Sequence, residues 1–169
     1  KNQLNKVHQS IGYAPQFDAV LPELTGYETL KIFSLIRGLP RHQIEENINH
    51  LANEFGFAQH LHKKIKAFSG GNKRKLSTAL AVLGDPQLIF LDEPTCGVDA
   101  EAKHHIWNSI KKIRDSGRAV VITSHSMDEC ESLCTKLGIM VSGEFKCLGS
   151  VQYLKNKYSK GFILTIKVG

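Results

Sequence analysis

One short apolar run that ends in two acids constrains the fold of this chain more than any other feature. Residues 88–91 read Leu-Ile-Phe-Leu and are followed at once by Asp92, Glu93 and Pro94. Such a run, bounded by turn residues, predicts a strand buried on both faces, as in a parallel sheet covered by helices. The two carboxylates would then favour a cation, with Asp92 as a ligand of Mg²⁺ and Glu93 orienting or activating a water. On this segment alone, the alternative that the acids only cap the next turn stays open.

A second motif, Ser69-Gly70-Gly71-Asn72, predicts the start of a helix that faces an anion. Ser69 is a favourable N-cap residue, and the paired glycines let the backbone approach a ligand closely. The first free amides of a helix and its dipole favour phosphate. Ser-Gly-Gly also occurs in plain flexible loops, so this motif needs support from the rest of the chain.

Two polar side chains follow other short apolar segments. His125 lies two positions after residues 119–123, a predicted strand, and just before a helix predicted at residues 126–136 that Ser126 and Glu129 cap. A histidine there can donate to a terminal phosphate or help to position water, although a half-buried structural histidine is the plainer alternative. Gln16 follows residues 11–14 and offers an amide that could contact Mg²⁺ or the water.

Taken together and in chain order, five features resemble the nucleotide-binding domain of ATP-binding cassette (ABC) transporters: Gln16, residues 69–72, residues 88–93, residues 96–99 and His125. The resemblance implies a role for each position. Gln16 matches the Q-loop glutamine, Asp92 the Walker B aspartate and Glu93 the catalytic glutamate. The remaining matches are Ser69, Gly70, Gly71 and Asn72 with the signature motif, Asp99 with the D-loop, and His125 with the switch histidine.

The sequence at residues 15–26 and 147–158 resembles that of subfamily A of this family, many of whose members move lipids. Two departures from the family pattern stand out. Phe68 and Asn72 replace the commoner leucine and glutamine of the signature, a mild variation. No G-x-x-x-x-G-K-[ST] phosphate loop occurs in the chain. We expect this loop, the Walker A loop of the family, to lie upstream of Lys1. The 169 residues would then be the larger, C-terminal portion of the domain and would hydrolyse no ATP by themselves.

The resemblance further implies a head-to-tail dimer of two such domains with ATP and Mg²⁺ between them. Asp92, Glu93, Gln16 and His125 would act on nucleotide held by their own domain, while the signature motif closes over nucleotide held by the partner. Asp99 would couple the two sites. Closure would drive transmembrane domains of the same transporter, which alone would contact the lipid, and this domain would sit on the cytosolic face of the membrane.

Composition narrows the classes of function. The 169 residues are 41% hydrophobic, enough for a real core, and no apolar run approaches the roughly 20 residues of a membrane helix. Four cysteines show neither metal-ligand pairs nor the density of a disulfide scaffold, which favours a reducing compartment. The net charge of +6 arises largely from scattered cations, and clusters such as Lys73-Arg74-Lys75 are predicted to be solvated faces rather than a nucleic-acid surface.

The predicted fold class is α/β: a P-loop NTPase (RecA-like) parallel sheet with an inserted helical subdomain, its N-terminal strands and Walker A loop absent. Residues 1–23 form the Q-loop region, 24–83 the helical subdomain, 84–149 the catalytic core, and 150–169 a last helix and a strand at residues 161–168. Within these, Thr25 and Glu28 predict a capping box. The helix after Asp99 should cross over to a parallel strand at residues 119–123, and Ser142-Gly143 predicts a hairpin.

Two alternatives keep the fold and change the function. A soluble ABC-type ATPase acting in translation or on DNA would carry tandem cassettes and no apolar spans in its complete reading frame. A degenerate cassette would bind nucleotide only for regulation, against which stand Glu93, His125 and both signature glycines.

Overall fold

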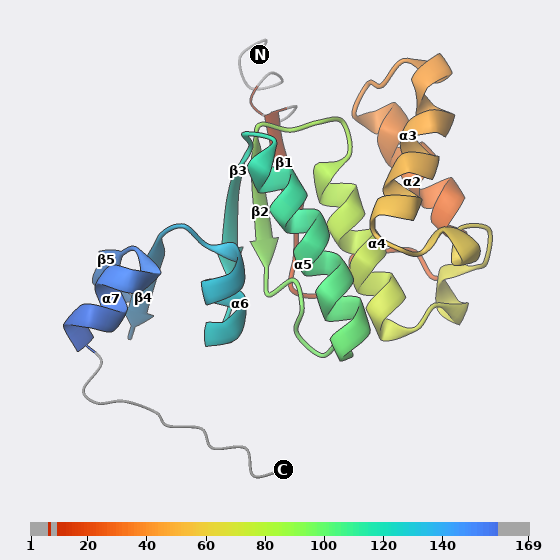
Figure 1. The fold of residues 1–169 in the computed structure, drawn as a ribbon. Helices are drawn as coiled ribbons and strands as arrows, with labels where there is room; N and C mark the ends of the chain where they lie inside the picture. Colours follow the sequence, from red (N-terminus) through yellow and green to blue (C-terminus); the bar gives the residue numbers. More distant parts are fainter. Residues whose placement is uncertain (1–6, 8–9, 159–169) are drawn as a thin grey trace, which may run out of the picture. The chain divides into compact units, whose positions relative to one another are not determined.

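The computed structural model describes Val7 and residues 10–158, and it divides the chain into two compact units, residues 1–125 and 126–169 (Figure 1). The strand predicted at residues 161–168 lies outside the described residues.

A three-stranded parallel sheet forms the centre of the first unit. Its strands β1 (Ile11–Ala14), β2 (Leu88–Asp92) and β3 (Ala119–Thr123) lie in the order β1-β2-β3 (Figure 1). The helix α5 (Ala100–Asp115) connects β2 to β3 and ends at Ser116-Gly117. The predicted strand–helix–strand crossover is therefore confirmed.

Helices α4 (Gly70–Val82) and α5 cover one face of this sheet (Figure 1). Ala14, Ile89 and Leu91 point toward that face and are at most 2% exposed. At Gly12 the helix comes so close that an added Cβ would lie 1.8 Å from the carbonyl oxygen of Ala81. Only glycine allows this contact, so Gly12 fixes how α4 lies on β1.

The opposite face of the sheet carries a row of large apolar side chains. Tyr13, Phe90 and Val121 are register partners across the three strands, and they are 56%, 36% and 47% exposed. The prediction that residues 88–91 are buried on both faces is thus wrong for the part of the chain that the structure describes. Alternation along β2 buries only Ile89 and Leu91, because the described helices that pack on this sheet lie on one side of it.

The segment between β1 and β2 is helical, as predicted. In α2 (Gly26–Ile36), Thr25 and Glu28 form the reciprocal capping box. Helix α3 (Arg41–Glu54) buries Ile44, Ile48 and Leu51, with Phe55 just beyond its end. Two short 3₁₀ turns, η1 (Ala58–His60) and η2 (Ile65–Ala67), then lead to α4.

The second unit contains α6 (Met127–Leu133), the antiparallel strands β4 (Leu137–Val141) and β5 (Glu144–Gly149), and α7 (Val151–Tyr158). The predicted hairpin is confirmed, with Ser142 and Gly143 both at positive φ, 51° and 80°, as the tight turn requires. Helix α6 is shorter than the predicted 126–136, because Cys134 is already extended. Within the described ranges no helix is long and apolar enough to cross a bilayer.

Candidate functional site

The candidate site lies at the carboxyl edge of the parallel sheet. Because the three strands run in one direction, Gln16 after β1, Asp92 and Glu93 at the end of β2, and His125 after β3 all emerge at the same edge. Open α/β sheets bind ligands at this edge. The topology thus unites residues that are up to 109 positions apart in the chain (125 − 16).

Glu93 lies at the centre of this group. Its Oε2 atom accepts a hydrogen bond of 3.3 Å from Gln16 Nε2 and lies 3.4 Å from His125 Nδ1. The Glu93 side chain is 25% exposed and that of His125 is 72% exposed, so the group is open to solvent and to a ligand. A carboxylate held between an amide and an imidazole can position a water molecule and accept its proton.

Thr123, the last residue of β3, ties the two acids to the neighbouring strand. Its hydroxyl donates to Asp92 Oδ1 and accepts a hydrogen bond of 3.0 Å from the backbone amide of Glu93. That amide also lies 3.1 Å from the Thr123 carbonyl. Glu93 itself has a φ of 45°, a left-handed conformation that costs a non-glycine residue roughly 1–2 kcal/mol. No motif of the sequence marks Thr123, and the usable signal was a polar residue that ends the predicted strand at residues 119–123.

The donor set at this edge fits Mg²⁺. Asp92 contributes a carboxylate and Gln16 an amide oxygen, which are the hard oxygen ligands that Mg²⁺ prefers. The amide nitrogen of Gln16 faces Glu93, leaving its oxygen as the atom that can accept or coordinate. The structure thus brings Gln16 directly to Glu93, whereas Asp92 is linked to the group through Thr123.

Residues 69–72, called the signature segment below, form the N-terminus of α4. Ser69 is the N-cap, and its side chain accepts a hydrogen bond of 3.2 Å from the Asn72 amide. The two glycines have different surroundings. A Cβ on Gly70 would meet nothing within 4 Å, whereas one on Gly71 would lie 2.8 Å from Ala102 Cβ and 3.2 Å from Asp99 Oδ2. Gly70 therefore keeps the helix end open, and Gly71 lets it pack against the start of α5.

Asp99 is the N-cap of α5, and its carboxylate lies beside Gly71 of the signature segment. Its Oδ1 atom accepts a hydrogen bond of 2.8 Å from the Ala102 amide. This bond, more than any other interaction, holds the pKa of Asp99 below its ordinary value, and burial acts in the opposite direction. The ionised Asp99 side chain thus caps α5 while its other oxygen borders Gly71.

Arg74 connects α4 to the loops that carry the candidate site, and sequence reasoning missed it. The expectation that Lys73-Arg74-Lys75 is a solvated face is wrong for two of the three, since Arg74 is 3% exposed and Lys75 is 6% exposed. The guanidinium reaches an ion-pair distance of 3.5 Å from Asp18. It also donates to five backbone carbonyls, those of Pro15, Gln16, Asp92, Glu93 and Pro94.

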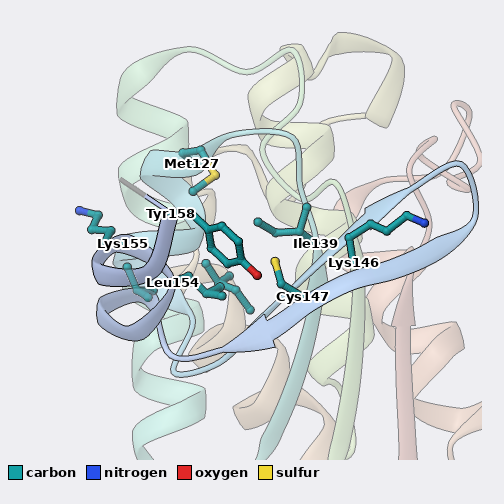
Figure 2. A pocket seen from close by; sticks show the side chains of 9 residues that line it. Met127, Ile139, Lys146, Cys147, Leu154, Lys155 and Tyr158 are labelled. Atoms are coloured by element: carbon teal, nitrogen blue, oxygen red, sulfur yellow. The ribbon is translucent and has the colours of Figure 1, made fainter. Parts of the chain in front are cut away.

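A separate hollow of about 410 Å³ lies within the second unit (Figure 2). Its walls come from α6, β4, β5 and α7 and are mostly apolar, including Ile139 and Leu154. Figure 2 shows the ammonium groups of Lys146 and Lys155 pointing away from it, and the two lysines pair with Glu144 and Glu131. No predicted site residue lines this hollow, so the polar groups suited to chemistry converge at the sheet edge instead.

Comparison with known proteins agrees with this geometry. The family model described as "ABC transporter" matches residues 1–96. The chain is 48% identical over 167 residues to the phospholipid-transporting ATPase ABCA3 of Rattus norvegicus. It is 50% identical over 165 residues to the retinal-specific phospholipid-transporting ATPase ABCA4 of Bos taurus. These matches cover 99% and 98% of this chain but only 10% and 7% of the two relatives.

The fold is also found among solved structures. An ATP binding subunit of an ABC transporter superposes with a TM-score of 0.81 at 24% sequence identity. The match covers 93% of this chain and 65% of that subunit. The α/β fold with a parallel sheet is thus the P-loop NTPase fold that the sequence predicts.

Proposed function

This chain belongs to the ABC transporter family, and on that premise we propose that it binds and hydrolyses ATP to power phospholipid transport by a longer polypeptide. The observation that carries the proposal is the position of Glu93, held between Gln16 and His125 at the carboxyl edge of the sheet. The names of the relatives, both phospholipid-transporting ATPases, support the choice of cargo. They favour transport over a role in translation or on DNA.

Each residue at the edge has a role in this proposal. Glu93 orients the attacking water and accepts its proton, and His125 holds Glu93 in place and contacts the terminal phosphate. Asp92 and the amide oxygen of Gln16 would hold Mg²⁺, which when bound would offset the charge of the ATP phosphates. Thr123 keeps Asp92 and Glu93 in a fixed relation through its hydroxyl.

The signature segment would serve a second ATP-binding domain. Ser69, Gly70 and Asn72 lie at the start of a 13-residue helix whose free amides and dipole favour a phosphate. Because Gly70 borders open space, a nucleotide held by the partner domain can approach the backbone there. Asp99 lies beside Gly71 and would carry movement of the signature segment to α5. Two such domains, arranged head to tail, would then close on ATP at the cytosolic face and move the membrane-spanning part.

The test uses Glu93→Gln in the complete polypeptide that contains these residues. The amide keeps the shape of the side chain but cannot accept a proton, so ATP hydrolysis should fall about 10²–10⁴-fold while ATP stays bound. Glu45→Gln on α3, an exposed position away from the sheet edge, is the matched control and should hydrolyse normally. Hydrolysis by the Glu93 variant at the wild-type rate would remove Glu93 from the mechanism.

The cargo is tested separately in liposomes that carry a labelled phospholipid. Wild-type protein should move the label in the presence of ATP, and Glu93→Gln should not. Hydrolysis without movement of any phospholipid would leave the ATPase in place and exclude the proposed cargo.

A further inference from the structure

A mixed set of metal-binding side chains occurs at the sheet edge. Glu93 follows β2, Cys96 lies in the turn after it, and His125 follows β3. One donor atom from each lies within 4.8 Å of the other two. The set offers an oxygen, a sulfur and a nitrogen, and it includes a thiol for which the proposed ATPase reaction has no use.

The spacing of these atoms fits a tetrahedral ion. Zn²⁺ binds nitrogen and oxygen at about 2.0–2.2 Å, which places two such ligands about 3.4 Å apart. The distance from His125 Nδ1 to Glu93 Oε2 is 3.4 Å. This edge of the tetrahedron is therefore already in place without a bound metal.

The third ligand needs only a small movement. A thiolate bound at about 2.3 Å would lie about 3.6 Å from the other two donors. Since the three donor atoms lie within 4.8 Å of one another, the Cys96 sulfur has to approach the other two by no more than about 1 Å. Cys96 is exposed and lies in a turn. The turn is closed by a hydrogen bond of 3.2 Å that the Cys96 backbone amide donates to the Glu93 carbonyl. This turn keeps the two side chains near each other. Gly97 follows with open space around it, so the turn can adjust.

The chemistry of the donors selects the metal. Mg²⁺ prefers oxygen ligands in an octahedral arrangement, whereas one thiolate, one imidazole and one carboxylate suit the softer Zn²⁺. Three protein ligands also leave a fourth position for water or a phosphate oxygen. We propose that Glu93, Cys96 and His125 form a Zn²⁺ site, distinct from the Mg²⁺ ligands Asp92 and Gln16.

Zinc at this site would act as an inhibitor, a consequence that rests on the proposed ATPase function. The ion would occupy Glu93 Oε2 and His125 Nδ1, the atoms that face each other and that the hydrolytic step needs. With both engaged, Glu93 can neither orient nor deprotonate a water. Zn²⁺ would therefore stop turnover in the presence of excess Mg²⁺.

The site is tested first by binding, in the complete polypeptide freed of metal. Co²⁺, a spectroscopic stand-in for Zn²⁺, should give a thiolate-to-cobalt charge-transfer band and tetrahedral ligand-field bands, and Zn²⁺ should displace both. Cys96→Ser should abolish the charge-transfer band, whereas the matched control Cys147→Ser, from the apolar hollow of the second unit, should keep it. A band that survives in Cys96→Ser, or no band in the wild type, overturns the site.

Inhibition is measured second, with each protein compared to its own zinc-free rate. The zinc concentration for half inhibition should rise about tenfold or more in Cys96→Ser, since loss of even an outer partner weakens metal sites by that factor. If the same zinc concentration half-inhibits the wild type and Cys96→Ser, the proposed site is not the one through which zinc inhibits. A Cys96-dependent cobalt band in a protein that hydrolyses no ATP would refute the proposed function and keep the metal site, so the two failures are distinguishable.

Discussion

The guanidinium of Arg74 donates a hydrogen bond of 2.8 Å to the backbone carbonyl of Glu93. The same group binds the carbonyl of Gln16 at 3.1 Å, so one buried side chain on α4 holds two residues of the candidate site. The helix that begins with the signature segment is thereby fixed to both loops.

Replacement Arg74→Lys should loosen the site and weaken the fold. Lysine has three donors on a flexible stem and cannot reproduce five directed N–H groups, so buried carbonyls lose their partners. We expect the free energy of unfolding to fall by about 2–4 kcal/mol and ATP turnover to fall by more than about tenfold. Urea unfolding and ATPase rates measure the two effects. Lys73→Met, one residue earlier and only half-buried, should change neither, and a fully active, stable Arg74→Lys variant would contradict the role.

Gly70 and Gly71 form a matched pair that separates function from stability. Gly71→Ala places a Cβ 2.8 Å from Ala102 and should lower the free energy of unfolding by about 1–3 kcal/mol. Gly70→Ala meets no neighbour and should leave stability unchanged or slightly raised, because alanine favours a helix. It should still weaken ATP-dependent association of two domains, measured by light scattering. Unimpaired association in Gly70→Ala would argue against a nucleotide approaching this helix end.

Gly12→Ala should damage the fold without touching the site. The added methyl would overlap the carbonyl oxygen of Ala81, and neither backbone can move without shifting α4 on β1. We expect a loss of about 3 kcal/mol or more in the free energy of unfolding, seen as a lower urea midpoint. An unchanged midpoint would mean that α4 can lie farther from the sheet than it does.

Asp99 should make stability depend on pH in the acid range. Its pKa is lowered in the folded protein, chiefly by the hydrogen bond from the Ala102 amide. A lowered pKa contributes stability that is present above the unfolded value, about 3.9, and is lost as pH falls through the folded value. Asp99→Asn keeps an accepting oxygen but does not ionise. The stability difference between wild type and Asp99→Asn should be constant above about pH 5 and shrink below pH 4, measured by circular dichroism. A difference that does not vary with pH would exclude ionised Asp99 as the cause.

The sequence predicts most helices and strands because their signals are local. Thr25 and Glu28 specify the start of α2, and the spacing of Ile44 and Ile48 specifies the buried face of α3. Ser142-Gly143 specifies a hairpin through the positive φ angles that its turn requires. Each of these depends on a few neighbouring residues, which a pattern can capture.

The residues that sequence reasoning missed act across long separations. Arg74 looks like one cation in a charged run, and only the packing of α4 shows that its partners are carbonyls of two distant loops. Thr123 gains its place from the register that pairs it with Asp92. The open face of β2 depends on which elements pack against the sheet. The order of motifs in the sequence is enough to identify Gln16, Glu93 and His125 as candidates. The contacts between them depend on the order of the parallel strands, which the motifs do not specify.

The apolar row of Tyr13, Phe90 and Val121 has a practical consequence for anyone producing this domain. Three neighbouring large side chains on a water-facing sheet should attract detergents, chaperones and other copies of the same polypeptide. Expression boundaries should therefore be chosen by whether this strip becomes shielded from a hydrophobic dye. Longer polypeptides that bind less of the dye, because the strip is covered, would be the ones suited to crystallisation and kinetics.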